Sequence, residues 1–275
     1  MGATTGTGVQ RTTVQVDGEP VSYLTAGQDG PAVLLLHGTY WSRVWLPVLG
    51  RLAEAGLRPI AVDFPGLGYS GGELIPETAA IPALADWVAR FVSAMEISGP
   101  VAVAGHDIGG AVAQHLLARD RLEVSRLALV NSVTYDSWPA PHVARLLDRA
   151  VTADEFLAAR REAVATDLAG AATEQRIAGY LAPWTDPRVR RSWLAMASAA
   201  DSRYTLGLVP ALRRSTTPKF LVWGEDDRFE KVAYAEEFAR EIPETTLLRI
   251  PAATHIRTEN APGRVARALI DFFVA

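Results

Sequence analysis

Hydrophobic and polar positions follow two different periods along this chain. Near the N-terminus they alternate at every second residue over Thr12–Val16 and Val21–Thr25, with Asp17-Gly18 between the two segments. This alternation around an Asp-Gly pair predicts an antiparallel β-hairpin. The next run, Ala32–Leu36, is continuously apolar, which is typical of a strand buried on both faces.

Further short apolar runs predict strands, and amphipathic stretches between them predict helices. The remaining strands are expected over Pro59–Val62, Val101–Ala104, Leu127–Val130, Phe220–Trp223 and Thr246–Ile250. The helices are expected over Trp45–Ala55, Ile81–Met95, a segment from Ala111, a segment between the last two strands, and Pro262–Phe273. Because strands and helices alternate, the pattern predicts a mostly parallel central sheet with helices on both faces.

The alternation is interrupted once, between residues 133 and 217, where only helical or irregular patterns occur. Examples are Ala153–Ala165, Glu174–Leu181 and Val189–Ala200. Ligands of open α/β sheets bind at the carboxyl ends of the strands, so an insertion there would form one wall of a pocket. We therefore predict a core domain from residues 1–132 and 218–275, with a helical cap over residues 133–217. Residues 1–10, rich in Gly and Thr, are expected to form a flexible tail.

Composition narrows the class of protein. The 275 residues are 49% hydrophobic and 21% charged, with a formal net charge of -4 and no cysteine. Both charge signs are scattered, which argues against nucleic-acid or membrane partners, and no apolar run reaches the about 18 residues of a membrane span. A thiolate nucleophile is excluded. Without a signal-peptide pattern, we expect a cytoplasmic monomer or homodimer that acts on a small molecule.

The segment Gly105-His106-Asp107-Ile108-Gly109-Gly110 stands between a predicted strand and a predicted helix. Glycines two residues before and two after the central residue are typical of a nucleophile elbow, where a sharp turn lifts one side chain above the sheet. The central residue here is a carboxylate, Asp107, at a helix N-terminus that favours an anion. Aspartate is also a common helix N-cap, so the elbow alone leaves a structural role open.

Three further positions support a catalytic role for Asp107. His37-Gly38-Thr39 directly follows the first buried strand, so the backbone N–H groups of Thr39 and Ile108 would form an oxyanion hole. Asp226 and Asp227 follow a late strand in Trp223-Gly224-Glu225-Asp226-Asp227, and the usual spacing after the glycine selects Asp227. His255 follows the last strand. The chain order Asp107, Asp227, His255 is that of nucleophile, acid and base in a triad on this architecture.

These motifs together resemble the α/β-hydrolases, specifically the branch with an aspartate nucleophile, which contains epoxide hydrolases and haloalkane and haloacetate dehalogenases. Asp63–Ser70 is similar to the D-x-x-G-x-G-x-S loop of that family, and Gly105–Gly110 to the epoxide-hydrolase elbow. Tyr180–Trp184 resembles a cap segment of the dehalogenases. The resemblance covers Thr12 to Phe273 and implies the α/β-hydrolase fold.

A carboxylate nucleophile suits displacement at an sp³ carbon. Asp107 would attack an epoxide or a carbon–halogen bond and form an alkyl ester. His255, held by Asp227, would then activate water to hydrolyse that ester. Attack on an ordinary acyl ester would give an anhydride, which ranks acyl hydrolysis low.

The leaving group separates the two hydrolytic possibilities. The resemblance to epoxide hydrolases implies cap tyrosines as proton donors, and the candidates are Tyr180, Tyr204 and Tyr135. The resemblance to dehalogenases implies halide donors, but Ile108 and Thr39 stand where those enzymes carry them. Indoles that could replace such donors are Trp41, Trp138 and Trp184.

We therefore predict an epoxide hydrolase that converts a largely apolar epoxide to a vicinal diol. No cofactor and no metal are expected, because the chain has no His-Glu-x-x-His cluster and Gly66–Gly72 lacks the residues of a phosphate loop. The alternatives are a haloalkane or haloacid dehalogenase, and a non-hydrolytic cyclase or lyase on the same fold. A ligand-binding pseudoenzyme ranks below these.

Overall fold

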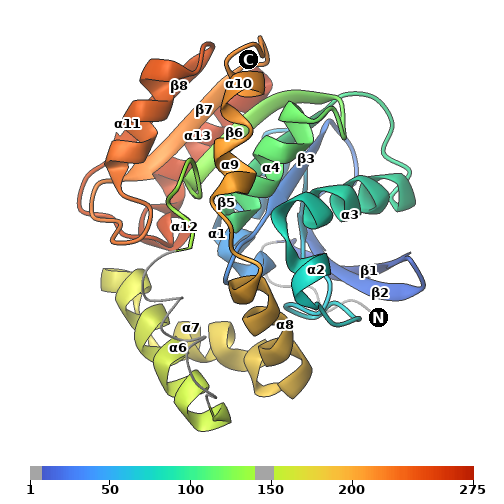
Figure 1. Ribbon diagram of the computed structural model, residues 1–275, viewed down its shortest axis with the longest axis vertical. Helices are drawn as coiled ribbons and strands as arrows, with labels where there is room; N and C mark the ends of the chain where they lie inside the picture. The colour runs from blue at the N-terminus through green and yellow to red at the C-terminus, as the bar shows by residue number, and fades with distance from the viewer. Residues whose placement is uncertain (1–7, 140–151) are drawn as a thin grey trace.

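Eight strands form one sheet in the computed structural model, which describes residues 8–139 and 152–275. The strand order is β1-β2-β4-β3-β5-β6-β7-β8 (Figure 1). The pairs β1–β2 and β2–β4 are antiparallel and all other neighbouring strands are parallel, so the predicted mostly parallel sheet is confirmed. The strands are β1 (Gln10–Val16), β2 (Glu19–Thr25), β3 (Ala32–Leu36), β4 (Arg58–Val62), β5 (Val101–Asp107), β6 (Val124–Ser132), β7 (Lys219–Gly224) and β8 (Thr245–Ile250).

The hairpin of β1 and β2 turns at the predicted Asp-Gly pair. Asp17 and Gly18 have φ values of 54° and 85°, and a two-residue turn with positive φ at both positions matches the twist of the strands it joins. The predicted antiparallel hairpin is therefore present, with its turn at this pair.

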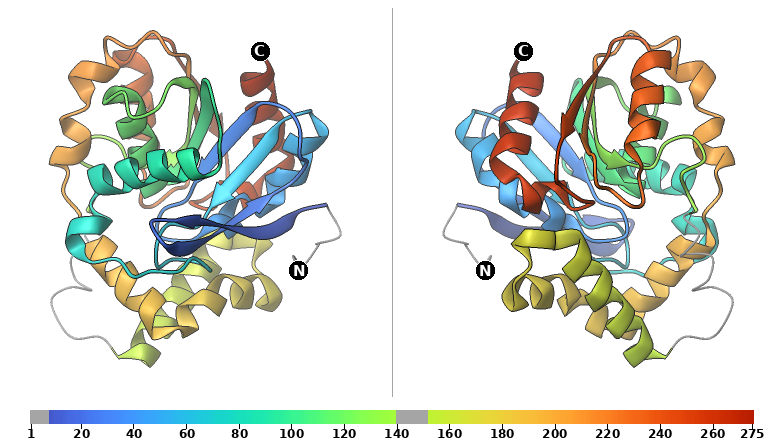
Figure 2. Two further views of the ribbon diagram at one scale, coloured as in Figure 1. Left: turned by 90° about the vertical axis from the view of Figure 1, so that its right-hand side faces the viewer. Right: turned by 90° about the vertical axis from the view of Figure 1, so that its left-hand side faces the viewer.

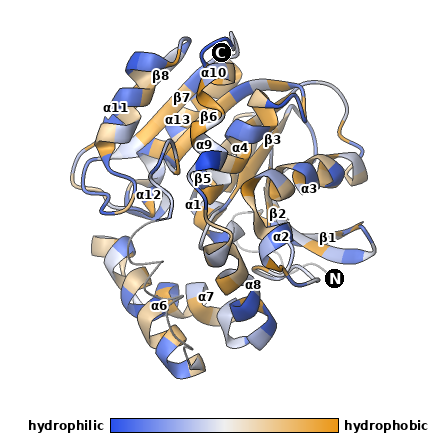
Figure 3. Cartoon of the chain, viewed as in Figure 1, coloured by the Kyte–Doolittle hydropathy of each residue, from blue (hydrophilic) through white to orange (hydrophobic). Residues whose placement is uncertain are grey.

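Helices cover both faces of the sheet (Figure 2). One face carries α1 (Leu46–Glu54) and α13 (Pro262–Val274), and the other carries α3 (Ile81–Ala94), α4 (Ile108–Ala118) and α11 (Val232–Glu241). Figure 3 shows that the strands between these layers are predominantly hydrophobic. Every residue of β5 is buried, as expected for a central parallel strand. Among the described residues, no helix is long and apolar enough to cross a membrane.

Three helices form a separate layer beside the core, namely α6 (Ala153–Leu168), α7 (Glu174–Leu181) and α8 (Pro187–Ser198) (Figure 1). The first of them starts at a capping box. The Thr152 hydroxyl accepts from the backbone N–H of Glu155 (3.2 Å), and the Glu155 carboxylate accepts from the backbone N–H of Thr152 (2.9 Å). This arrangement satisfies N–H groups that a helix start leaves unpaired.

The last part of the predicted cap segment packs on the core. The short helices α9 (Arg203–Leu206) and α10 (Val209–Leu212) contact α4, as Figure 1 also shows. Leu208 and Leu212 are buried there, which explains why this stretch returns to the core. Two further short helices, α2 (Pro76–Ala79) and α12 (Arg257–Asn260), lie in loops of the core.

Candidate active site

Asp107 is the last residue of β5 and adopts a conformation that non-glycine residues rarely take, with φ 54° and ψ -127°. Such a backbone is strained, and the buried strand and helix on either side hold it in place. The flanking glycines are required by close packing, since a Cβ at Gly109 would lie 2.5 Å from the carbonyl oxygen of His37. The predicted elbow geometry is therefore present around Asp107.

The register of β3 and β5 brings Thr39 to this elbow, because Leu36 pairs with Gly105. The Asp107 Oδ2 accepts from the Thr39 backbone N–H (2.8 Å) and from the Thr39 hydroxyl (2.7 Å). The Ile108 backbone N–H is the second predicted donor of the oxyanion hole. Within the described residues it forms no hydrogen bond with the Asp107 carboxylate. Sequence reasoning predicted the backbone N–H of Thr39 as a donor but missed its hydroxyl, which is a second donor from the same residue.

His37 fixes the segment that carries Thr39. Its Nε2 accepts from the backbone N–H of Phe64 (3.0 Å), so its proton lies on Nδ1, which donates to the carbonyl of Gly38 (2.9 Å). Burial lowers the pKa of His37, which keeps the ring neutral in this tautomer. The buried ring thereby orients the peptide that precedes Thr39.

Asp227 is the buried member of the predicted acidic pair, whereas Asp226 is exposed. The backbone N–H groups of Phe229 and Glu230 donate to its Oδ1, at 2.8 and 3.1 Å. Its Oδ2 accepts from the side-chain amide of Asn131 and, at 2.9 Å, from Nδ1 of His255. Burial raises the pKa of Asp227. The charge and hydrogen bond of His255 lower it, and together with the other hydrogen bonds they outweigh burial, so the net shift is downward.

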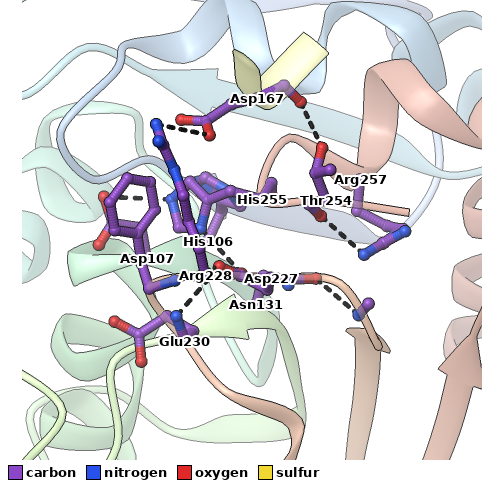
Figure 4. Close-up of polar contacts among 12 residues, drawn as sticks. His106, Asp107, Asn131, Asp167, Asp227, Arg228, Glu230, Thr254, His255 and Arg257 are labelled. Atoms are coloured by element: carbon purple, nitrogen blue, oxygen red, sulfur yellow. Dashed lines mark hydrogen bonds and ion pairs between the residues drawn. The ribbon is translucent and has the colours of Figure 1, made fainter. Parts of the chain in front are cut away.

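His255 lies between two carboxylates (Figure 4). Its Nε2 is 3.8 Å from the Asp107 Oδ2, while its Nδ1 contacts Asp227. Burial lowers the pKa of His255, but the charges and hydrogen bonds of both carboxylates outweigh burial and raise it well above its usual value. For Asp107, burial raises the pKa, and the hydrogen bond and charge of His255 bring it well below its ordinary range. Both shifts favour an imidazolium at His255 and a carboxylate at Asp107.

His106, in the elbow, supports the loop of His255. Its Nε2 is 3.0 Å from the backbone carbonyl of His255, and its Nδ1 is buried with no hydrogen-bond partner among the described residues. Burial and the nearby His255 charge lower the pKa of His106 to about 4. The ring is consequently neutral at physiological pH, and its Nε2–H donates to the backbone carbonyl of His255.

A narrow, partly open cavity of about 20 Å³ lies over these residues. Residues of the core and of helices α6 and α8 both line it. Its walls combine aromatic rings with five ionisable groups. The lining residues are Thr39, Tyr40, Asp107, Trp138, Arg160, Ala163, Asp167, Trp193, Phe229, Glu230 and His255.

Of the predicted leaving-group residues, Trp138 alone lines this cavity. The Tyr180 hydroxyl donates to Glu259 (3.2 Å), and the Tyr135 hydroxyl donates to Glu241 (2.6 Å). Tyr204 lies on α9, where its carbonyl is bonded to His115 (3.1 Å). The hydroxyls of Tyr180 and Tyr135 are therefore engaged elsewhere, and Tyr204 lies on α9, which contacts α4.

The two remaining predicted indoles also lie behind the cavity wall. The Trp41 indole donates to the carbonyl of Tyr180 (3.1 Å). Trp184 packs against Tyr40 and Phe156, with ring centroids 6.0 and 6.2 Å apart. They shape the wall rather than reach Asp107.

Sequence reasoning missed two charged cavity residues of the cap, Arg160 and Asp167. The buried positions of α6 include Phe156, Arg160 and Val164, which are spaced four residues apart, with Asp167 on the next turn. This spacing places a cation and a carboxylate on the inward face of the helix. Charged residues on an otherwise apolar stripe were the signal that could have revealed them.

Glu230 is a third residue that sequence reasoning missed, and no pattern in the chain marked it. It is 1% exposed, lines the cavity, and has a buried Oε2 without a hydrogen-bond partner among the described residues. Burial raises the pKa of Glu230 well above its usual value, the Ser137 hydrogen bond acts against this, and the charges of Asp107 and Asp227 raise it further. These shifts favour the neutral, protonated form of the side chain.

His106, Asp107 and His255 could offer ligand atoms to a metal ion, since one atom from each lies within 4.8 Å of the others. The His106 Nε2 already contacts the His255 carbonyl, and the Asp107 Oδ2 lies at ion-pair distance (3.8 Å) from the His255 Nε2. A protonated His255 would also oppose a cation. The donor set therefore fits a proton-transfer triad better than a metal centre.

The sheet, the elbow after β5, and the acid and histidine after β7 and β8 are the parts that define an α/β-hydrolase. A sequence model of the Alpha/beta hydrolase family matches residues 33–268. The chain belongs to this family.

Similar proteins include both kinds of enzyme that the elbow suggested. The chain is 27% identical to a haloalkane dehalogenase of Mesorhizobium japonicum, over 97% of this chain and 92% of that protein. An α/β hydrolase fold protein from Burkholderia ambifaria superposes with a TM-score of 0.84 at 24% identity, covering 94% of this chain and 97% of the other. The epoxide hydrolase CorEH superposes with a TM-score of 0.80 at 23% identity, covering 97% and 99%.

Proposed function

We propose that this α/β-hydrolase opens epoxides to vicinal diols through a covalent ester on Asp107. The observation that carries the proposal is the ionised Asp107, which lines the cavity beside His255 and is held by Thr39. An ionised carboxylate at a cavity wall is suited to attack an sp³ carbon. A neutral acid on the same wall suits an alkoxide leaving group, which needs a proton.

In the first step, an oxygen of Asp107 forms a bond to one epoxide carbon while the bond from that carbon to the epoxide oxygen breaks. We assign Glu230 as the acid that protonates the departing oxygen, because it lines the cavity and its raised pKa keeps it protonated. The products of this step are a hydroxyalkyl ester on Asp107 and a Glu230 carboxylate. This role replaces the cap tyrosines of the sequence-based prediction.

The second step depends on a change in the charge around His255. Esterification removes the negative charge of Asp107, which is one of the causes that raise the pKa of His255. The His255 imidazolium can then transfer its proton to the Glu230 carboxylate. The neutral imidazole that results accepts a proton from water. The resulting hydroxide attacks the ester carbonyl carbon, and the oxyanion forms at the Thr39 N–H and hydroxyl.

Collapse of this tetrahedral intermediate breaks the bond between the Asp107 carbonyl carbon and the ester oxygen, and the departing alkoxide takes the proton of the new Asp107 carboxylic acid. The diol leaves, and Asp107 is again a carboxylate, His255 an imidazolium and Glu230 an acid. Asp227 takes no proton in this cycle. It positions His255 and stabilises its charge, while Asn131 holds Asp227.

A dehalogenase is the second candidate, because the Mesorhizobium japonicum haloalkane dehalogenase matches nearly the whole chain. A halide leaves without a proton and is stabilised by N–H donors. Trp138 lines the cavity and could provide one, whereas the Trp193 indole already donates to the carbonyl of Thr39 (3.0 Å).

Product analysis with a panel of aryl and alkyl epoxides and bromoalkanes separates the two candidates. We expect diols from epoxides and little bromide release. Bromide release without any diol would replace the proposal with the dehalogenase. The same assay on Asp107→Asn should yield neither product.

A further inference from the structure

Arg160 is a buried cation in the wall of the active-site cavity. It lies on α6 and is 6% exposed. Its guanidinium stands over the rings of Tyr40, Trp184 and Trp193, at 5.3, 4.9 and 5.0 Å from the ring centroids. Three aromatic faces stabilise the charge of a cation. They do not accept the five N–H bonds that a guanidinium can donate.

The hydrogen-bonding capacity of Arg160 is unused. Within the described parts of the chain it forms no hydrogen bond and no ion pair, and its buried Nε has no partner. Burying an unpaired charge is costly. A buried guanidinium with unused N–H donors at the wall of a cavity is suited to bind an anion that enters the cavity.

The carboxylates near Arg160 are engaged by other groups. The Asp167 Oδ2 accepts from the Tyr40 hydroxyl (2.6 Å), and its Oδ1 lies 3.4 Å from a guanidinium nitrogen of Arg228 (Figure 4). Asp107 is bonded to Thr39 and faces His255. Neither carboxylate is within ion-pair distance of Arg160, so neither occupies its N–H groups, and the residue lines the cavity.

The end of α6 is tied to the loop of His255. The Thr254 hydroxyl donates to the carbonyl of Asp167 (2.6 Å), and the Asn260 side-chain amide donates to the carbonyl of Leu168 (2.7 Å). The helix that carries Arg160 is therefore held at a fixed place relative to the reacting groups. An anion on Arg160 would be oriented with respect to Asp107.

We propose that Arg160 binds a carboxylate of the substrate, so that the enzyme acts on epoxides that carry an acid group. The inference rests on the proposed function for the chemistry of the epoxide, but not for the binding of the acid. It changes the expected substrate from a largely apolar molecule to an amphipathic anion. The charge of Arg160 would also offset the repulsion between that anion and Asp107.

A pair of ligands without an epoxide tests the anion site independently of catalysis. Calorimetric titration of the wild type should give a Kd for 3-phenylpropanoate that is about tenfold or more below the Kd for 3-phenylpropanamide, because the two differ in the charge that Arg160 would pair with. Equal affinity for the two ligands, or tighter binding of the amide, would overturn the proposal.

Variants assign the preference to Arg160. Arg160→Met should abolish the preference for the acid, and Arg160→Lys should keep part of it while retaining a cation among the rings. Arg161→Met is the matched control, since Arg161 is the next residue of α6 and pairs on the surface with Glu174 (2.5 Å). A preference that survives in Arg160→Met contradicts the proposal. If that variant does not fold, the wild-type comparison and Arg160→Lys still decide it.

Turnover separates failure of this inference from failure of the proposed function. We expect a higher kcat/KM for 3-phenylglycidate than for its primary amide, and loss of that difference in Arg160→Met. Equal diol formation from both substrates would contradict the proposed anion site but would still support the proposed epoxide hydrolase. Tight binding of the acid without any diol would leave the anion site standing and remove the proposed function.

Discussion

Thr39 donates to Asp107 twice, from its backbone N–H at 2.8 Å and from its hydroxyl at 2.7 Å, and both bonds end on Oδ2. This oxygen would become the carbonyl oxygen of an ester formed through the other oxygen. It would also carry the oxyanion during hydrolysis. The two steps of the proposed reaction therefore depend differently on the Thr39 hydroxyl.

Thr39→Val should slow hydrolysis of the ester by about tenfold to a hundredfold, because the oxyanion loses one donor and keeps the backbone N–H. Alkylation should change much less, so the ester should accumulate. Rapid-quench mass spectrometry of the intact protein measures both rates. Thr13→Val, at an exposed position of β1, is the control. An equal effect on both steps would contradict the assignment of Thr39.

Gly38→Ala should reduce turnover by about a hundredfold or more. The added Cβ would lie 2.5 Å from the Asp107 Oδ2, and a carboxylate displaced by about 1 Å loses its attack geometry. Gly170→Ala is the matched control, since no atom lies within 4 Å of its Cβ. Diol formation and thermal unfolding would be measured for both variants. Wild-type turnover in Gly38→Ala would show that the carboxylate position does not limit the reaction.

Glu230→Gln should slow epoxide alkylation by a factor of about 10² to 10⁴, the usual contribution of a general acid. The amide keeps the shape of the side chain but supplies no acidic proton. A bromoalkane, whose leaving group needs no proton, should be little affected wherever it reacts. Glu225→Gln is the control in the same loop, where Glu225 pairs with Arg249 (2.8 Å). Unchanged alkylation by epoxides in Glu230→Gln would remove Glu230 from the mechanism.

His106 should make the protein sensitive to acid. Its pKa of about 4 in the folded chain lies below the value of about 6.5 in an unfolded one. Between these values the unfolded chain binds more protons, so the free energy of unfolding falls as pH falls through the window. The full effect is on the order of 3 kcal/mol.

His106→Gln removes this titration while keeping a donor for the His255 carbonyl. Urea unfolding at several pH values between about 4 and 6.5 should therefore give a flatter dependence for the variant than for the wild type. Because the pKa of His37 and that of His115 are also lowered, the informative quantity is the difference between the two proteins. Parallel curves would mean that His106 does not titrate as its burial implies.

Much of the fold was predictable because its signals are local. The Asp-Gly pair sets the turn of the first hairpin, and short apolar runs identify the strands of the parallel sheet. The elbow, Asp227 and His255 each follow a strand end, and parallel strands bring their carboxyl ends to one edge. Glu174–Leu181 was placed to the residue, since Thr173 caps the start of this helix and Ala182-Pro183 follow its end.

The cap side of the site was not predictable in the same way. Which face of α6 or α7 meets the cavity depends on packing against the core, and Tyr180 turned to Glu259 while Arg160 turned inward. Tyr204 was expected at the cavity because it lies in a helical insertion, but Leu208 and Leu212 draw that stretch back to α4. Glu230 acquires its properties from burial, which its neighbours in sequence do not indicate.

The covalent ester on Asp107 is the central claim, and trapping it tests the account most directly. His255→Gln removes the base for hydrolysis and leaves Asp107 in place, so the variant should be alkylated once by an epoxide and then stop. Intact-protein mass should rise by the mass of one epoxide, and peptide mapping should place the adduct on Asp107. An unmodified His255→Gln protein under conditions in which the wild type forms diol, together with an active Asp107→Ala, would contradict the account.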